Sequence, residues 1–347
     1  MSEQRQRVFS GIQPSGSTHL GNYLGALRNW ERLQHNMDSV YCIVDLHALT
    51  LPKAPGEVVE GTMNMTRMLM AIGIDPALSI LFTQSHVHQH AELGWLMQCV
   101  TGYGELRRMT QFKDKSDRLG GVSESDADEA TSGNNASISA GLFTYPALQA
   151  ADILLYDTDV VPVGDDQRQH IELTRDLANR MNSRYGEGTV VVPDHQIPAA
   201  GARVMNLQYP EQKMSKSVGS DAGTINVLDD PKAIEKKVRR AVTDNDGEVR
   251  FDVQEKPGVS NLLSILAACT GDDPEKLAEK YTQYGPLKAD TAAAVIAELT
   301  PIQERYRAIS DSDVAATLAV GAEKATAVAA PVMQRIRTAI GLVSPTP

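Results

Sequence analysis

Residues 8–27, with the sequence VFSGIQPSGSTHLGNYLGAL, constrain the fold of this chain more than any other stretch. A short apolar run ends at Phe9, glycines and Pro14 interrupt the segment that follows, and we expect a helix to begin near Asn22. A strand that leads through a glycine-rich loop into a helix is where α/β proteins bind phosphate, because unpaired backbone N–H groups and the helix dipole favour anions there. The segment matches neither G-x-G-x-x-G nor G-x-x-x-x-G-K-[ST], so dinucleotide and Walker-type sites are poorly supported.

A second short motif, KMSKS, occupies residues 213–217. Two lysines separated by two small or flexible residues can place two ammonium charges on one polyphosphate, and serine hydroxyls and backbone amides add donors. Taken alone, this motif can be a solvated basic loop, and HLGN at residues 19–22 can be an ordinary glycine-rich turn with a surface histidine. The presence of both motifs favours a nucleotide site built from two distant segments.

Length and composition narrow the class of protein. With 347 residues, 42% of them hydrophobic and 22% charged, the chain has the composition of a globular protein and room for two domains. No apolar run is long enough to span a bilayer and the N-terminus is polar, so we expect no membrane association and a cytoplasmic location. Cys42, Cys99 and Cys269 are isolated from one another, which indicates neither a disulfide framework nor a zinc site, and we expect no metal bound by protein side chains.

The formal net charge of −11 argues against a protein that binds nucleic acid over its whole surface. Any contact with RNA has to be local. The densest basic cluster lies in residues 232–240, which are either a solvated helix face or a contact with RNA phosphates.

The apolar pattern predicts an α/β protein with a parallel sheet in its first part and helices in its second. Short β-branched runs are typical of buried parallel strands, helical spacings separate them, and no strand pattern competes beyond residue 231. The expected strands are 40–44, 78–82 and 159–163, and the expected helices are 57–72, 91–100, 105–113, 145–155 (capped by Thr144, with Pro146 in its first turn), 261–268, 274–281, 289–300, 301–309 and 332–340.

Several polar residues are candidates for a site because of their positions on these elements. His47 follows the carboxyl end of strand 40–44, where open α/β sheets bind ligands, although it can simply hydrogen-bond the next loop. Tyr145, Gln149 and Asp152 form one polar row along an otherwise apolar helix, which is either a solvated face or the lining of a pocket. The acids after residue 163 can be ordinary helix N-caps.

The motifs together resemble a known family. HLGN looks like the HIGH signature of class I aminoacyl-tRNA synthetases, with Asn in the last place, and KMSKS is the second signature of that class. The surrounding SGIQPSG and NYLGAL, and YPALQAADILL at residues 145–155, are similar to the tryptophanyl-tRNA synthetases. The resemblance covers residues 9–341. It implies a Rossmann-like catalytic domain over 1–205, with a helical insertion at about 105–180, and a KMSKS loop with a helical, anticodon-binding domain over 206–347.

The resemblance also implies roles for individual residues. Catalysis would rest on His19, Asn22, Lys115, Lys213 and Lys216. ATP would be bound by Gln13, Pro14, Ser15, Gly21, Asn22, Gly164, Asp165, Asp166, Val204, Lys213, Met214, Ser215, Lys216 and Ser217. Tryptophan would be bound by Phe9, Gln13, His47, Tyr145, Gln149, Asp152 and Gln167, with Asp152 accepting the indole N–H. Gln149 stands where many family members have Met, and the acidic loop at 117–137 after Lys115 is longer than usual.

The implied reaction has two steps: L-tryptophan and Mg²⁺-ATP form an adenylate, and the 3′ end of tRNA(Trp) then takes the acyl group. Mg²⁺ would arrive with ATP, and a homodimer is the family expectation. Three alternatives stay open from the sequence. They are a tyrosyl-tRNA synthetase, which would need a site for a phenol; a non-catalytic tRNA-binding paralogue, which degraded signatures would mark; and a small-molecule adenylyltransferase, which would not need the helical second domain.

Overall fold

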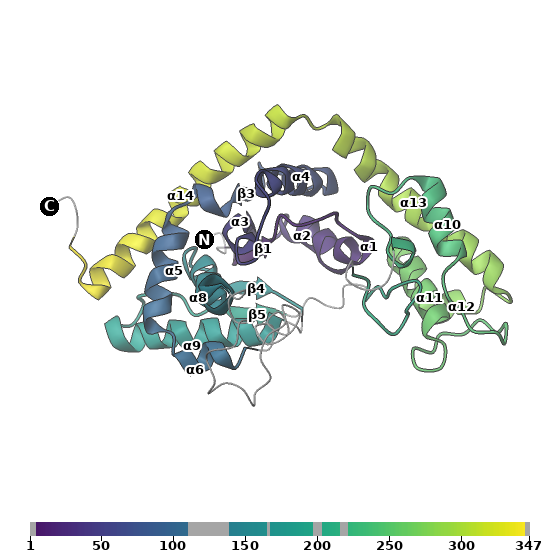
Figure 1. Ribbon diagram of the computed structural model, residues 1–347, viewed down its shortest axis with the longest axis horizontal. Coiled ribbons are helices and arrows are strands. Elements are labelled where there is room, and N and C mark those ends of the chain that lie inside the picture. Colours follow the sequence, from purple (N-terminus) through teal and green to yellow (C-terminus); the bar gives the residue numbers. More distant parts are fainter. Residues whose placement is uncertain (1–4, 110–138, 165–166, 197–202, 216–220, 344–347) are drawn as a thin grey trace.

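The computed structural model describes residues 5–109, 139–164, 167–196, 203–215 and 221–343. Its described part forms an α/β body and a group of helices that lies to one side of this body in Figure 1. None of the described helices combines the length and the hydropathy that crossing a membrane requires.

The centre of the α/β body is a five-stranded sheet whose strands pair in parallel, in the order β3-β2-β1-β4-β5. The predicted α/β class is therefore confirmed. From β1 the chain continues to β2 and β3 on one side and later adds β4 and β5 on the other. Ligands of open α/β sheets bind at such a reversal, beyond the carboxyl ends of the strands. The strands are β1 Arg7–Ile12, β2 Asp38–Ile43, β3 Ser79–Thr83, β4 Val160–Pro162 and β5 Asp194–Gln196.

Each face of the sheet is covered by its own apolar core, because successive strand residues point to opposite faces. Tyr41 and Ile43 belong to the core shared with the helices after residue 231, whereas Val40 and Cys42 belong to the core under the helices of the α/β body. Among the helices of the α/β body, α4 Glu57–Ile72 packs in the first of these cores. The second core contains residues of α5 Gln89–Val100, α6 Tyr103–Arg107, α8 Ala140–Leu154 and α9 Arg168–Tyr185. The short α3 Asp45–Ala48 and η2 Gln84–His86 lie at strand ends.

Two helix starts differ from the sequence prediction. The helix expected at 145–155 begins at Ala140, where the Ser139 hydroxyl accepts a hydrogen bond from the Leu142 N–H at 3.0 Å. Pro146 therefore lies inside α8 rather than in its first turn, and Thr144 is not the cap. The first helix begins at Leu20 rather than near Asn22; α1 Leu20–Asn22 continues through a π-helical turn, η1 Tyr23–Leu27, into α2 Arg28–Leu33.

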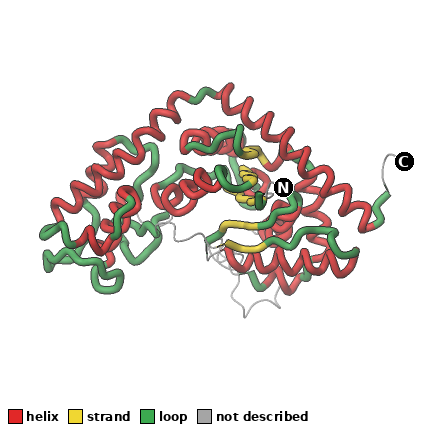
Figure 2. Tube along the Cα trace, turned by 180° about the vertical axis from the view of Figure 1, so that it is seen from behind, coloured by secondary structure: helices red, strands yellow, loops and turns green. Residues whose placement is uncertain are grey.

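The second part of the chain is helical, as predicted, but with fewer breaks. Its helices are α10 Pro231–Arg239, α11 Pro257–Thr270, α12 Pro274–Ala278, α13 Tyr284–Ala308 and α14 Asp311–Ile340. The two helices expected on either side of Pro301 are one helix, and 332–340 is only the end of α14. Figures 1 and 2 show α13 and α14 meeting at an angle, with α14 running back over the α/β body. The domain boundary at residue 205 stays a prediction.

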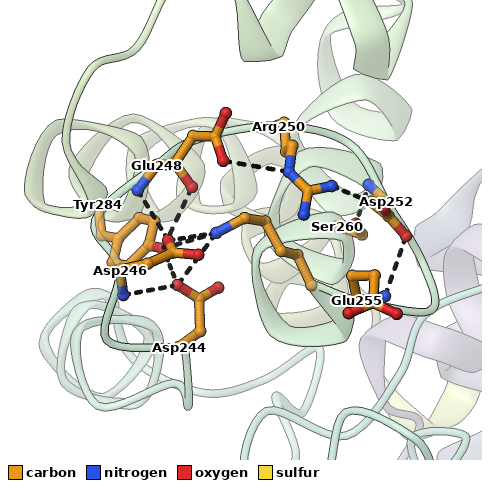
Figure 3. A network of polar contacts seen from close by, with 9 residues as sticks. Asp244, Asp246, Glu248, Arg250, Asp252, Glu255, Ser260 and Tyr284 are labelled. Atoms are coloured by element: carbon orange, nitrogen blue, oxygen red, sulfur yellow. Dashed lines mark hydrogen bonds and ion pairs between the residues drawn. The ribbon is translucent and has the colours of Figure 1, made fainter.

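A polar network fixes the loop between α10 and α11. The Lys256 side chain is almost fully buried; its ammonium group donates to Asp244 at 3.1 Å and also to Asp246, and the Tyr284 hydroxyl donates to the same two carboxylates. Figure 3 shows these acids and Tyr284 converging on one point. Arg250 and Asp252 extend the network with an ion pair of 2.6 Å. The loop is thereby tied to both α11 and α13.

Candidate active site

A cavity of about 340 Å³ opens at the reversal of the sheet, beyond β1 and β4. This volume lies in the range of small-molecule sites, which are about 300–1,000 Å³. Its wall is formed by β1, β4, α3 and α8, with apolar contributions from Val44, Ile153 and Val161. The structure brings together at this cavity all of the residues that the sequence assigned to tryptophan, namely Phe9, Gln13, His47, Tyr145, Gln149, Asp152 and Gln167.

Asp152 is a polar group of the cavity wall whose carboxylate is held by three hydrogen bonds. Its carboxylate accepts hydrogen bonds from His47 Nε2 at 2.8 Å on Oδ2, and from His90 Nδ1 and Gln84 Nε2, both at 2.7 Å, on Oδ1. The residue is 1% exposed. Burial by itself raises the pKa of Asp152, but the hydrogen bonds from His47 and His90 outweigh it and lower the pKa below its ordinary value. The cavity therefore presents an ionised acceptor.

Aromatic side chains shape the rest of the cavity. The Tyr145 hydroxyl lies 2.8 Å from His170 Nε2, and burial raises the pKa of Tyr145 to about 12, so the phenol stays protonated. The His47 ring meets Tyr145 edge-on, with centroids 6.2 Å apart. Phe9 stacks on Tyr156 at 5.6 Å. The cavity that Phe9, His47 and Tyr145 line suits a flat apolar ligand with one N–H donor.

The HLGN motif forms a compact cap at the start of α1. His19 Nδ1 accepts a hydrogen bond from the Asn22 N–H at 3.2 Å, and Asn22 Oδ1 accepts from the His19 N–H at 3.4 Å. His19 is buried and Asn22 is exposed, and a Cβ placed on Gly21 would come within 3.2 Å of the His19 ring. The motif therefore leaves Asn22 exposed at the start of α1 and Gly21 buried beside the His19 ring. Gln13 and Ser15 are exposed in the preceding loop, where Pro14 is buried.

The second motif lies directly against the first. The Met214 side chain is buried, and its Cβ lies 3.5 Å from the point where a Cβ on Gly21 would stand. The Met214 N–H donates to the Val204 carbonyl at 3.0 Å, and the Leu20 N–H donates to the Ile225 carbonyl at 2.8 Å. Lys213 is exposed beside this junction. Segments almost two hundred positions apart thus form one surface, as the two-motif prediction required.

Some predicted site residues lie outside the described residues. They are Lys115, Asp165, Asp166, Lys216 and Ser217, together with the acidic loop 117–137. Their roles stay predictions. Gly164 and Gln167, which flank two of them, both line the cavity.

The sequence analysis missed Gln84, His90 and Tyr156. All three are fully buried, and each contributes to the surroundings of Asp152. Gln84 follows β3, so its place at a strand end was a usable signal, whereas nothing in the local sequence distinguishes His90 from a core histidine. Among the described residues no group of three or more His, Cys, Asp or Glu could hold a metal ion. That no protein metal site exists stays a prediction.

The comparisons with known proteins agree with this geometry. The profile of the family described as "tRNA synthetases class I (W and Y)" matches residues 1–300. The Tryptophan–tRNA ligase 2 of Streptomyces avermitilis is 50% identical over 348 residues, with 99% of each chain covered. A solved tryptophanyl-tRNA synthetase from Mycoplasma pneumoniae is 35% identical, with a TM-score of 0.87 over 98% of this chain and 99% of that one. One from Campylobacter jejuni, complexed with ADP and tryptophan, is 32% identical, with a TM-score of 0.79 over 97% and 100%.

Proposed function

Because the chain belongs to the tryptophan and tyrosine branch of the class I aminoacyl-tRNA synthetases and acts as a tryptophan–tRNA ligase, we propose that the cavity at the sheet reversal binds the indole ring. The protein activates L-tryptophan with ATP and passes it to tRNA(Trp). Full-length identity of 48–50% to tryptophan–tRNA ligases decides between this function and the tyrosine-specific alternative. The Campylobacter jejuni relative, solved with tryptophan and ADP, supports the same pair of ligands here.

The surroundings of Asp152 carry the assignment of the indole site. A carboxylate offers about four positions for hydrogen bonds, and three are occupied by His47, His90 and Gln84. The fourth lies on Oδ2, in a side chain that lines the cavity. An indole N–H completes the set, whereas phenylalanine leaves an ionised acceptor buried without its donor, at a cost of about 1–3 kcal/mol or more.

We propose that ATP lies along the junction of the two signature motifs. Its phosphates would meet the start of α1 at His19 and Asn22, with the adenine near Gly21 and Val204, and Mg²⁺ would accompany the phosphates. The tryptophan carboxylate attacks the α-phosphorus and pyrophosphate leaves, so no protein nucleophile is required. The ammonium groups of Lys213, Lys216 and Lys115 would stabilise the charge that develops on pyrophosphate as the bond breaks.

The exposed face of α10 is our candidate for the tRNA contact. Lys232, Lys236, Arg239 and Arg240 are exposed. Lys237 is not available, because its ammonium group is buried against Asp229 at 2.8 Å and Asp221 at 2.9 Å. A local basic face on an acidic protein fits a partner held through phosphates, and a tRNA ligase is expected in the cytoplasm, where tRNA is used.

We also propose a homodimer, formed through the surface around α5. Trp95 is 65% exposed and Tyr103 is 70% exposed, which is unusual for residues of this size. Beside them a groove of about 220 Å³ between α5 and α8 is lined by Ala91, Gly94 and Leu148. Sedimentation of the protein and of Trp95→Glu tests this surface: we expect a dimer for the parent and a monomer for the variant. An unchanged dimer would place the interface elsewhere.

Pyrophosphate exchange into ATP, run with each amino acid in turn, tests the ligase assignment. Tryptophan should support exchange, and tyrosine and phenylalanine should not. A benzothiophene analogue of tryptophan, which has a similar shape but no N–H, tests the indole contact. The parent should reject this analogue, and Asp152→Ala should reduce kcat/KM for tryptophan far more than for the analogue. Equal losses for the two substrates would mean that Asp152 supports the fold and does not select the substrate.

A further inference from the structure

His90 links the indole acceptor to a buried tyrosine. Its ring is fully buried, with Nδ1 2.7 Å from Asp152 Oδ1 and Nε2 2.8 Å from the Tyr156 hydroxyl. The ring centroids of His90 and Tyr156 are 5.5 Å apart, and Phe82 packs against both rings. None of the three rings reaches the surface, so the link is fixed in one arrangement.

The hydrogen bonds assign the protons along this link. The ionised Asp152 can only accept, so His90 Nδ1 carries a proton toward it. A neutral ring then has Nε2 as an acceptor, which the Tyr156 O–H satisfies. Burial raises the pKa of Tyr156 well above its ordinary value, and the phenol therefore keeps the proton that it donates. Tyr156 thus fixes which nitrogen of His90 is protonated, and His90 fixes Oδ1 of Asp152.

We propose that His90 and Tyr156 are positioning residues that set the selectivity for tryptophan, by holding the Asp152 carboxylate at the angle at which Oδ2 meets the indole N–H. This inference rests on the proposed contact between Asp152 and indole. Gln84 also donates to Oδ1 and His47 donates to Oδ2, so His90 is one of the two donors that hold Oδ1. When His90 no longer donates, Oδ1 retains a single donor and the carboxylate can rotate about its Cβ–Cγ bond. The contact that discriminates N–H from sulfur then weakens, while the apolar cavity remains.

Two amide substitutions separate the two hydrogen bonds of His90. The amide nitrogen of H90N stands near the position of Nδ1, so this variant retains the donor to Asp152 and loses the contact with Tyr156. The amide of H90Q reaches the position of Nε2, so it retains the contact with Tyr156 and loses the donor to Asp152. Y156F removes only the hydroxyl. Y41F is the matched control, because Tyr41 is also fully buried and its hydroxyl donates one hydrogen bond, to the Trp30 carbonyl at 2.6 Å.

The measured quantity is the ratio of kcat/KM for tryptophan to kcat/KM for the benzothiophene analogue, in pyrophosphate exchange. Thermal unfolding of each variant reports stability separately. A hydrogen bond to a charged group corresponds to a factor of about ten or more. We expect the ratio to fall by about that factor in H90Q, to fall less in Y156F, and to change by less than about threefold in H90N. Y41F should lose stability and keep the parent ratio.

The outcomes separate this inference from the proposed function. A ratio that collapses in D152A but is unchanged in H90Q and Y156F would overturn the positioning role and leave the indole contact intact. A ratio that is unchanged in D152A would overturn the indole contact, and the positioning role with it. Equal losses of activity toward both substrates in H90Q and H90N, parallel to a loss of stability, would assign His90 to the fold alone.

Discussion

At the scale of single residues, two imidazoles and an amide stabilise the buried carboxylate of the site. Asp152 is surrounded by the side chains of His47, His90 and Gln84, and no Lys or Arg contacts it among the described residues. The hydrogen bonds that these three side chains donate favour the charged form of the carboxylate. The acceptor consequently remains ionised and still attracts an N–H donor from the cavity.

Two lysines should separate the two steps of the reaction. Lys213→Ala is expected to lower kcat for pyrophosphate exchange with little change in the KM for tryptophan, because the lysine meets charge that develops only as the bond breaks. Lys232→Ala should leave exchange unchanged and weaken aminoacylation, with a smaller dependence on salt, because Lys232 lies on the face proposed for tRNA. Steady-state kinetics of both reactions test the pair. An unchanged kcat in Lys213→Ala would remove that residue from catalysis.

The residues of the site differ in how far the sequence revealed them. The polar row of Tyr145, Gln149 and Asp152 was predictable because helical spacing places these residues on one face. The hydrogen bonds of Asp152 to His90 and Gln84 were not, since they join helices and strand ends that only the tertiary fold brings together. For Lys237 the sequence suggested a role that the structure does not allow. Lys237 is part of a basic cluster in the sequence, but its ammonium group forms ion pairs with Asp221 and Asp229.

At the scale of elements, α4 supports the nucleotide loop through a glycine. The backbone of Gly61 lies directly against the Pro14 carbonyl, and an added Cβ would overlap that oxygen. Pro14 is buried, so the loop that leads to HLGN rests on this helix. Helix propensity alone would favour Ala at position 61 by about 1 kcal/mol.

We therefore expect Gly61→Ala to destabilise the protein, although helix propensity alone predicts that it stabilises α4. The loop has to move away from α4, so the KM for ATP should rise and the protein should be less stable, with overpacking of about 1–3 kcal/mol exceeding the gain in propensity. Gly285→Ala is the control, because Gly285 is in α13 with nothing near its Cβ position, and it should stabilise the protein slightly. ATP kinetics and urea unfolding test both variants. A Gly61→Ala protein as stable and active as the parent would contradict the support role.

The network of Figure 3 predicts a dependence of stability on pH. The hydrogen bond from Lys256 lowers the pKa of Asp246, so the stability that Asp246 contributes is present above its unfolded pKa and lost as the pH falls. Burial by itself lowers the pKa of Lys256, but its bonds to Asp246 and Asp244 raise it overall, so its charge persists at neutral pH.

Lys256→Met should accordingly be less stable than the parent at pH 7. The difference should shrink progressively as the pH falls below about 4, because protonation of these carboxylates in the unfolded chain then removes the stability that their contact with Lys256 contributes. Lys280→Met is the control, since Lys280 is exposed and 3.8 Å from Asp272, and it should have little effect at either pH. Urea unfolding at the two pH values measures this. A Lys256→Met deficit that is the same at both pH values would show that packing, not charge, is what the lysine supplies.

Element types were predictable and their boundaries were not, and the reasons are specific. The strand runs around residues 40 and 80 are apolar and β-branched, and both became strands of the sheet. Pro146 and Pro301 were interpreted as helix starts, because the first turn is where proline fits best. Both lie inside longer helices, α8 and α13, where packing along the whole helix outweighs the lost N–H.

At the scale of the whole molecule, α14 joins the two parts of the chain. It begins beside α4, where Arg67 forms an ion pair with Asp311, and it ends beside α5, where Arg337 forms two bonds of 2.6 Å with Glu92. Between these points it crosses the edge strand β3. The helix thus covers the sheet edge that would otherwise present unpaired backbone groups. The preceding helix α13 packs among the helices of the second part of the chain.

Gly321 is the point of closest approach between α14 and the sheet, and it tests this arrangement. A Cβ on Gly321 would overlap the Leu81 carbonyl in β3. Propensity predicts that Gly321→Ala stabilises a helix by about 1 kcal/mol, whereas overpacking against backbone predicts a loss of about 1–3 kcal/mol, so the sign of the change decides which effect dominates. Ala319→Gly measures the propensity difference between Ala and Gly in this helix without a packing effect, because Ala319 is on its exposed face. It should lower the free energy of unfolding by about 1 kcal/mol.

We expect Gly321→Ala to lower the unfolding temperature, because neither a helix backbone nor a paired strand can yield without losing hydrogen bonds. Tryptophan fluorescence follows Trp30 and Trp95, both in the α/β body, while far-ultraviolet circular dichroism follows all the helices. The two signals should give one coincident transition in the parent, since one apolar core includes Leu20 and Tyr41 of the body together with Leu262 and Val295 of the second part. A higher unfolding temperature in Gly321→Ala would mean that α14 does not approach β3 as closely as this arrangement requires. If the two signals gave separate transitions in the parent protein, the shared core would not couple the two parts of the chain.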